Sequence, residues 1–440
     1  MTLKITREQI KKLPKTDLHV HLDGSVTPKT IVELAKAQKV DLVAESKKLG
    51  IGDLKSGSAD ELDDKVFKSE YNSLGEYLIP FELVNTVLRT PESLEEAAYR
   101  MACDEFNEGV RYFEVRFAPQ KHWHKDFAWS DIVKSVDRGL RKAMNEFNSH
   151  DNVRVNGEMP YKCGMILCAM RMINPHMGDY FSTLYSLHTG EDIQNLSMMS
   201  SAEVAHLAVK SMKEGALVVG FDLAGREDGY PAATHREAFE YCYNNGVQTT
   251  CHAGEAYGPE SIMGAIKYCQ VRRIGHGTQL FQWEKIQRRN PDGSEMTQAQ
   301  KIEYMNNIAE RMARERTTIE VCLKSNSQTT PSLRDLSKHP IRDFLKYNLR
   351  VALSTDNRAI SRVSVTDEYM TLLKHYSVDT KTLRNICLAG FKAAFFPGAY
   401  AQHREYMRKS IDFYTECFKK HIGDYKEIDQ IAKGESVTAG

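Results

Sequence analysis

His19 and His21 could bind a single metal ion, because they lie two positions apart at the end of an apolar segment. Residues i and i+2 of a β-strand point to the same side, so two imidazoles at this spacing can converge on one cation. A second pair, His122 and His124, has the same spacing but lies in a charged, aromatic stretch, where we expect surface histidines. We therefore predict that the first pair belongs to a metal site.

Three further motifs carry imidazole and carboxylate groups. His252 and Glu255 are separated by Ala-Gly, and the glycine allows the backbone to turn. His276 lies between two glycines, and Asp356 follows an apolar run that ends in Ser-Thr. Taken singly, these motifs also fit a helix N-terminus, a loop histidine and a surface turn. Together with the first pair they provide metal ligands, and they leave Glu255 and His276 for proton transfer.

The predicted ligands share nitrogen and oxygen donor atoms and include no thiolate; they are His19, His21, His252 and Asp356. Such a set suits one catalytic Zn²⁺ with an open position for water, although Fe²⁺, Mn²⁺ or Co²⁺ would also bind. A metal of this kind lowers the pKa of its bound water to ~7. The sequence thus predicts a mononuclear centre that activates water.

Helices and short apolar strands alternate along the chain. We expect eight strands, at about 17–21, 111–118, 163–170, 217–223, 247–252, 272–276, 317–322 and 350–355. This alternation predicts an α/β fold, a (β/α)8 TIM barrel that forms a single domain over residues 1–440. In such barrels the active site lies at the C-terminal rim, where the strands end. The candidate metal ligands and proton-transfer residues all lie at predicted strand ends.

Two segments depart from the simple repeat. Residues of about 30–100 form a helical insertion, which could be a wall or lid over the barrel mouth or a plain insertion. Residues of about 281–316 contain the turn Asn-Pro-Asp-Gly between two charged stretches, which predicts a helical hairpin on the surface. The small, polar tail at 434–440 is expected to fray.

Composition limits the partners of the chain. Its 440 residues include 59 Lys and Arg and 59 Asp and Glu, and zero net charge argues against a nucleic acid or an anionic membrane as partner. No apolar stretch approaches the ~18 residues of a membrane span, and no secretory signal is seen. Nine cysteines without a C-x-x-C pair are typical of reduced thiols, so we expect a cytoplasmic protein.

Seven segments of the sequence resemble the adenosine deaminase family, in the order of that family and over nearly the whole chain. They are TDLHVHLDGS (16–25), YFEVRFAP (112–119), VVGFDLAG (218–225), CHAGE (251–255), RIGHGT (273–278), IEVC (319–322) and LSTDN (353–357). The resemblance implies a barrel with one zinc ion and a small-molecule purine nucleoside as substrate. It implies conversion of adenosine or 2′-deoxyadenosine to inosine or deoxyinosine and ammonia.

The resemblance also implies roles for individual residues. The four ligands named above match the family's zinc ligands, Glu255 its proton donor to purine N1, and His276 the group that takes the proton from the attacking water and steadies it. The backbone N–H of Gly225 matches a donor to N3, and Asp23 a contact of the ribose 5′-hydroxyl. Asn357 replaces a second aspartate; its amide can donate directly to N7, so we expect that contact to be kept.

Several alternatives stay open. The substrate could be another 6-aminopurine, such as aminodeoxyfutalosine, adenine or N6-methyl-AMP. Asp23 argues against a 5′-phosphate because two anions repel, but Arg171, Arg226 or Arg358 would contradict this if they faced the pocket. A binuclear site would usually need a lysine at the end of the fourth strand, where this chain has Asp222. The missing C-x-x-C excludes cytidine-deaminase chemistry. A catalytically silent nucleoside-binding barrel is the alternative of another class, and the oligomeric state stays open.

Overall fold

Eight parallel strands form the centre of the molecule, as predicted. The computed structural model describes residues 3–425 and 428, so the tail at 434–440 lies outside the described residues. Each strand pairs with the next in the chain, in the order β1 to β8. The strands are β1 (Lys15–His21), β2 (Val110–Phe117), β3 (Lys162–Met170), β4 (Val218–Ala224), β5 (Gln248–Ala253), β6 (Arg273–His276), β7 (Thr318–Val321) and β8 (Arg350–Leu353).

Main-chain hydrogen bonds between β1 and the segment after β8 close the barrel. The Asp356 N–H donates to the His19 carbonyl at 2.7 Å, and the His21 N–H donates to the Asp356 carbonyl at 2.7 Å. The seam of the barrel therefore runs through three of the predicted metal ligands.

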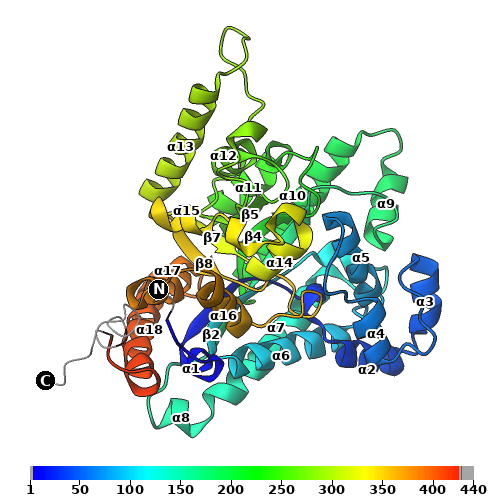
Figure 1. Cartoon of the computed structure of the whole chain (residues 1–440). Coiled ribbons are helices and arrows are strands. Elements are labelled where there is room, and N and C mark those ends of the chain that lie inside the picture. The colour runs from blue at the N-terminus through cyan, green and yellow to red at the C-terminus, as the bar shows by residue number, and fades with distance from the viewer. Residues whose placement is uncertain (1–2, 426–427, 429–440) are drawn as a thin grey trace, which may run out of the picture.

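Helices cover the outside of the barrel (Figure 1). Those that follow the strands are α6 (Pro91–Asn107), α7 (Trp129–Asn148), α10 (Ile193–Lys213), α11 (Arg236–Asn244), α12 (Pro259–Tyr268), α13 (Gln298–Glu315), α15 (Ile341–Lys346) and α17 (Thr380–Ala393). Thr90 and Ser93 form a capping box at the start of α6, with Pro91 in the first turn. Gly139 lets α7 approach α6 closely, because a Cβ there would collide with the Glu95 carbonyl oxygen.

Additional helices extend both ends of the barrel and its rim. The segment between β1 and α6 contains α2 (Pro28–Gln38), α3 (Leu42–Leu49), α4 (Ala59–Lys65) and α5 (Leu74–Asn85), so the predicted insertion is helical. The remaining helices are α1 (Arg7–Lys12), α8 (Asp151–Arg154), α9 (Asp179–Leu187), α14 (Leu323–Thr329), α16 (Val365–His375) and α18 (Tyr400–His421). In the part of the chain that is described, no helix is both long and apolar enough to cross a bilayer.

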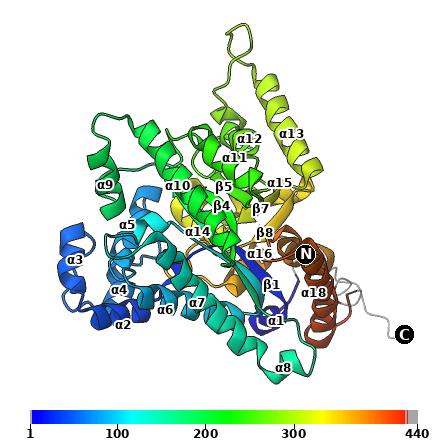
Figure 2. The same ribbon diagram turned by 180° about the vertical axis from the view of Figure 1, so that it is seen from behind.

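The segment at 281–316 is not the predicted helical hairpin. Its second half is α13, but its first half contains one 3-10 turn, Trp283–Lys285, followed by extended chain. An antiparallel bridge pairs Arg289 with Glu295 around a tight turn, in which the Asp292 carboxylate accepts the Ser294 N–H at 2.9 Å. Helical conformation is disfavoured for the residue before Pro291, which explains the extended first arm. Figure 2 shows the arm projecting away from the barrel.

A candidate metal centre at the ends of the strands

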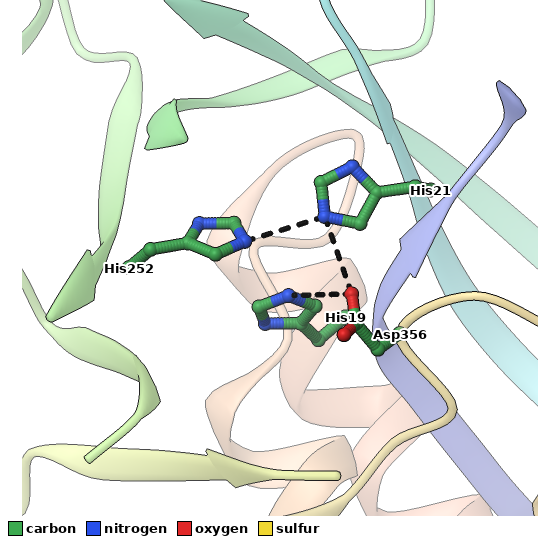
Figure 3. Close-up of side chains that lie close together, drawn as sticks. All are labelled: His19, His21, His252 and Asp356. Atoms are coloured by element: carbon green, nitrogen blue, oxygen red, sulfur yellow. Dashed lines mark hydrogen bonds and ion pairs between the residues drawn. The ribbon is translucent and has the colours of Figure 1, made fainter. Parts of the chain in front are cut away.

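The four predicted metal ligands lie together at the carboxyl ends of the strands (Figure 3). His19 and His21 come from β1, His252 comes from β5, and Asp356 follows β8. Their candidate ligand atoms all lie within 4.8 Å of one another. The His21 Nε2 atom is 3.3 Å from His252 Nε2 and 3.4 Å from Asp356 Oδ1, and His19 Nε2 is 3.5 Å from the same carboxylate oxygen.

The hydrogen bonds of the imidazoles leave their Nε2 atoms available to a cation. His19 Nδ1 is 2.7 Å from the Glu320 carboxylate, and His252 Nδ1 is 3.1 Å from the Asp222 carboxylate. A carboxylate can only accept there, so each Nδ1 carries a proton and each Nε2 keeps its lone pair. The His19 Nε2 atom is buried without a hydrogen-bond partner. An orphaned nitrogen beside a carboxylate and two further imidazoles fits a divalent metal of the zinc type.

A buried layer of charged residues holds these ligands in place. Arg116 on β2 donates to Asp222 and to Glu320, both at 2.8 Å, and all three side chains are fully buried. Burial would raise the pKa of Asp222, but the charges of His252 and Arg116 outweigh it and hold that pKa well below its usual range. The Ser325 hydroxyl donates to Asp356 Oδ2 at 2.5 Å. The orientation of the ligands is therefore set by groups on β2, β4, β7 and α14.

Glu255 follows β5 and lies beside His276. Its carboxylate is 3.9 Å from His276 Nε2. Burial, reinforced by the charges of Asp356 and Glu227, raises the pKa of Glu255 to about 8. The Glu227 carboxylate accepts main-chain N–H bonds from Gly254 at 2.7 Å and from Glu255 at 3.0 Å, which fixes the loop after β5. At neutral pH this arrangement offers a proton to a ligand in the site.

His276 ends β6 in the left-handed region, with φ of 67°, a conformation that is uncommon for residues other than glycine and that concentrates at functional sites. Burial, together with the neighbouring His19, lowers the pKa of His276 well below its ordinary value. Its Nδ1 atom is 3.0 Å from the Asn326 amide nitrogen. The low pKa favours the neutral imidazole, and the Asn326 amide fixes its orientation through Nδ1.

A cavity of about 610 Å³ opens above the metal ligands. Its lining includes most of the predicted site residues, namely His21, Asp23, Gly225, His252, Glu255, His276, Asp356 and Asn357. His19 lies beneath them and is fully buried. Tyr77 and Phe81 of α5 line one wall, so part of the predicted helical insertion is a wall of the cavity.

The three residues predicted to contact the substrate, Asp23, Gly225 and Asn357, differ in their surroundings. Burial raises the pKa of Asp23 to about 6. Gly225 has φ of 92°, and a Cβ there would lie 3.1 Å from the Met170 methyl carbon. The Asn357 amide donates one of its two N–H groups to the Tyr77 hydroxyl at 2.8 Å, which leaves the other for a second acceptor.

The three arginines that could bind a 5′-phosphate differ in whether they reach the cavity. Arg226 lines the cavity, whereas Arg358 pairs with Glu105 at 2.5 Å, outside its lining. Arg171 is buried and donates to the His252 carbonyl at 2.5 Å, also outside the lining. Arg226 is thus the one residue of the three that the structure brings to the cavity.

The second histidine pair does not join the metal cluster found among the described residues. His122 Nδ1 is 3.1 Å from the Leu88 carbonyl, and His124 Nε2 is 3.0 Å from the Arg89 carbonyl. The prediction of surface histidines is wrong for His122. Its side chain is fully buried, and its ring is hydrogen-bonded to the main chain that follows α5.

The charged layer and the loop anchors were not among the predicted site residues. Asp222 and Glu320 each interrupt an apolar predicted strand with a carboxylate, and this is the signal that could have found them. Glu227, Asn326 and His339 had no comparable signal, because their roles depend on neighbours that are distant in sequence.

The fold and the cluster define a class, a (β/α)8 barrel with a metal-binding site at the carboxyl ends of its strands. The sequence matches the profile of the adenosine deaminase family over residues 14–201 and 181–412. The chain belongs to the adenosine deaminase family. Its class of activity is the metal-dependent hydrolytic deamination of an aminopurine.

Relatives of known name agree with this membership. The adenosine deaminase of Mycobacterium marinum is 30% identical over 396 residues, which cover 90% of this chain and 94% of that protein. An adenine deaminase from Arthrobacter aurescens has a TM-score of 0.67 at 20% identity, covering 92% and 99% of the two chains. The N6-methyl-AMP deaminase of Arabidopsis thaliana has a TM-score of 0.64 at 21% identity, covering 92% and 98%. These two structures share the fold, and their names differ in the aminopurine.

Proposed function

We propose that this protein converts adenosine and 2′-deoxyadenosine to inosine and deoxyinosine, with release of ammonia. The observation that carries the proposal is the position of the buried Glu255 carboxyl group, whose pKa is raised to about 8, in the same cavity as the histidine and aspartate cluster. Hydrolysis at C6 of an adenine ring needs a proton at N1 while water adds to C6, and Glu255 holds such a proton. The relative from Mycobacterium marinum, named adenosine deaminase, supports the choice of substrate.

The residues of the cavity divide the work between chemistry and recognition. His19, His21, His252 and Asp356 would hold one Zn²⁺, which supplies a Lewis acid that lowers the pKa of a water molecule to about 7. Glu255 gives its proton to N1 as the water oxygen bonds to C6. One proton of the water then goes to the amino group, which leaves as ammonia, and the other returns to Glu255 as the C6 carbonyl forms. The Gly225 N–H would bind N3, Asp23 the 5′-hydroxyl, and the Asn357 amide N7.

The charges of the cavity support a nucleoside over a nucleotide. Both cationic side chains in the described lining have a carboxylate partner. Lys121 Nζ is 2.6 Å from Glu82, and Arg226 Nη2 is 3.6 Å from Asp228. A 5′-phosphate would compete with these carboxylates for the cations and would also face Asp23. A neutral 5′-hydroxyl meets neither cost.

We also propose that the protein works in the cytoplasm. All nine cysteines are free thiols in the structure, and eight of them are buried. Reduced, buried thiols suit a reducing compartment.

Turnover of a substrate panel tests the proposal. Zinc-loaded protein is assayed with adenosine, 2′-deoxyadenosine, AMP, adenine, N6-methyl-AMP and aminodeoxyfutalosine, by the ultraviolet change from amino- to oxopurine and by ammonia release. Fast turnover of the first two substrates, lost on adding a chelator, is the expected result. Preference for another member of the panel would refute the substrate, and zinc binding without any turnover would favour a silent nucleoside-binding barrel.

A further inference from the structure

Three buried side chains, His276, Asn326 and His339, form a hydrogen-bonded chain that ends at the main chain of α15. The Asn326 amide nitrogen is 3.0 Å from His276 Nδ1, and the Asn326 amide oxygen is 3.2 Å from His339 Nε2. The Ile341 N–H lies 3.2 Å from His339 Nδ1. None of the three side chains belongs to the metal cluster, and each is at least 98% buried.

The main-chain group at the far end sets the direction of every bond in this chain. A backbone N–H can only donate, so His339 Nδ1 must accept and its proton must sit on Nε2. His339 Nε2 then donates to the Asn326 oxygen, and the Asn326 nitrogen donates to His276 Nδ1. The opposite orientation of the amide would require both nitrogens of His339 to accept, which a neutral imidazole cannot do.

Burial supports this arrangement at His339, the last of the three side chains. It lowers the pKa of His339 to about 3, so the ring is neutral at any pH at which the protein is expected to work. A neutral ring has one proton to donate, and the Ile341 bond assigns that proton to Nε2.

We infer that Asn326 and His339 are positioning residues that fix the tautomer of His276, with Nδ1 accepting a hydrogen bond and the ring proton on Nε2. His276 lines the cavity, and its Nε2 atom lies on the side of Glu255. The catalytic consequence rests on the proposed function. In this form the imidazole donates a hydrogen bond to the attacking water, and it cannot take a proton at Nε2.

The resemblance gave His276 two tasks, to take the proton of the water and to steady it. The hydrogen-bond chain supports the second task. The proton of the water then needs another acceptor, and Glu255 becomes a carboxylate once it has protonated N1. Glu255 can take that proton and pass it to the departing amine, which leaves as ammonia. The second proton of the water then moves from O6 to Glu255, which gives the oxopurine and restores the acid.

Nitrogen NMR of histidine tests the inference directly. Protein labelled with ¹⁵N-histidine is compared with a His276→Asn variant, which identifies the resonances of His276. The expected wild-type spectrum at neutral pH shows a protonated Nε2 and an unprotonated Nδ1. A proton on Nδ1, alone or together with one on Nε2, would overturn the inference. The spectrum is recorded with the metal-free protein, so it stays decisive even if adenosine is not the substrate.

An isosteric substitution reverses the direction of the chain. Asn326→Asp places an acceptor against His276 Nδ1, which should move a proton to Nδ1 and reduce kcat by roughly 10², the cost of losing a preorganised donor. Zinc content should not change. In a matched pair, His339→Gln keeps a donor to Asn326 and should keep both the wild-type tautomer and kcat within a few-fold. His339→Leu removes that donor and should lower kcat. Equal kcat values for the Gln and Leu variants would contradict the positioning role.

Discussion

As the proposed proton donor, Glu255 illustrates how a functional group can oppose the stability of the fold that holds it. The carboxyl group must stay protonated to serve as an acid, and the cavity achieves this by burial next to Asp356 and Glu227. The charged form is therefore penalised in the folded protein and free in the unfolded chain. The same environment that prepares the proton makes folding depend on pH.

Replacing Glu255 by glutamine should stabilise the metal-free protein in a pH-dependent way. The native carboxyl has a pKa of about 8 against an ordinary value of 4.5, so between these values the native state binds a proton that the unfolded state lacks. Wild-type stability should fall as pH rises through this window, while that of Glu255→Gln should not. Urea unfolding at pH 5, 6.5 and 8 should show a gap that widens to about a few kcal/mol.

The control for this experiment is Glu310→Gln, which changes an exposed carboxylate. A gap between Glu255→Gln and wild type that is the same at all three pH values would contradict the raised pKa. In the zinc-loaded enzyme, Glu255→Gln should retain metal and nucleoside and lose turnover by roughly 10² to 10⁴. Unchanged turnover would remove Glu255 from the reaction.

Single residues were the most predictable part of the site. His19, His21, His252 and Asp356 could be selected because each is a metal-binding residue type at the end of an apolar strand. Asn326 could not be selected, because an asparagine near a strand end has many roles and its function depends on His339 and Ile341. A role that follows from the residue type could be predicted from the sequence. A role that depends on a particular spatial neighbour could not.

Strands β2, β4 and β7 are tied together by one guanidinium group. Arg116 bridges Asp222, which holds His252, and Glu320, which holds His19. Removing one partner of a buried ion pair leaves an uncompensated charge, which is strongly destabilising. Here the loss would also release two metal ligands at once.

Arg116→Met should lower zinc affinity about 10- to 100-fold, the usual cost of losing a residue that orients metal ligands. Arg273→Met is the matched control, because Arg273 is equally buried and pairs with Glu114 at 2.5 Å and with Glu320 at 2.7 Å, but not with Asp222. Competition with a chromophoric chelator gives the affinity, and urea unfolding gives the stability. We expect the two variants to lose similar amounts of stability. Arg116→Met should lose clearly more zinc affinity than Arg273→Met. Equal losses of affinity would show that the bridge to Asp222 does not matter.

The extended conformation of the arm at 281–297 was not predicted from the sequence. Charged residues at its tip fit an exposed helix and an exposed loop equally well, because neither buries them. The eight strands were predictable because burial on both sides requires apolar runs, which a surface arm lacks.

Shortening the arm should leave catalysis intact. No residue of 281–316 lines the described cavity, and the side-chain bonds of the tip turn stay within this segment, with one 3.5 Å contact from the Asn290 amide to Gln300 in α13. Replacing residues 290–294 by Gly-Asn should therefore change kcat/KM less than about twofold and the unfolding free energy by less than about 0.5 kcal/mol. A large loss of activity at unchanged stability would instead assign the arm a part in the reaction, and size-exclusion chromatography of both proteins would reveal any change of oligomeric state.

At the scale of the whole molecule, the metal cluster lies where the barrel closes. His19 and His21 belong to the first strand and Asp356 follows the last, and the same residues carry the main-chain bonds between them. These two main-chain bonds form the bridge of Val20 with Asp356, and side chains add to it: the Leu18 N–H donates to the Ser354 hydroxyl at 3.2 Å and the Thr355 N–H to the Asp17 carboxylate at 3.3 Å. A metal bound to these side chains should therefore act as a cross-link between the two ends of the sheet.

Zinc should stabilise the protein as a whole and the closing seam most of all. Binding at 100 times the dissociation constant adds about 2.7 kcal/mol to the unfolding free energy. In hydrogen exchange followed by mass spectrometry, peptides covering 15–23 and 350–358 should slow on zinc addition, whereas a peptide covering 162–170 of β3 should change little, because β3 holds no ligand. An Asp356→Ala variant should lose the effect on both seam peptides. Equal slowing of all strands would mean that the metal stabilises the barrel without closing it.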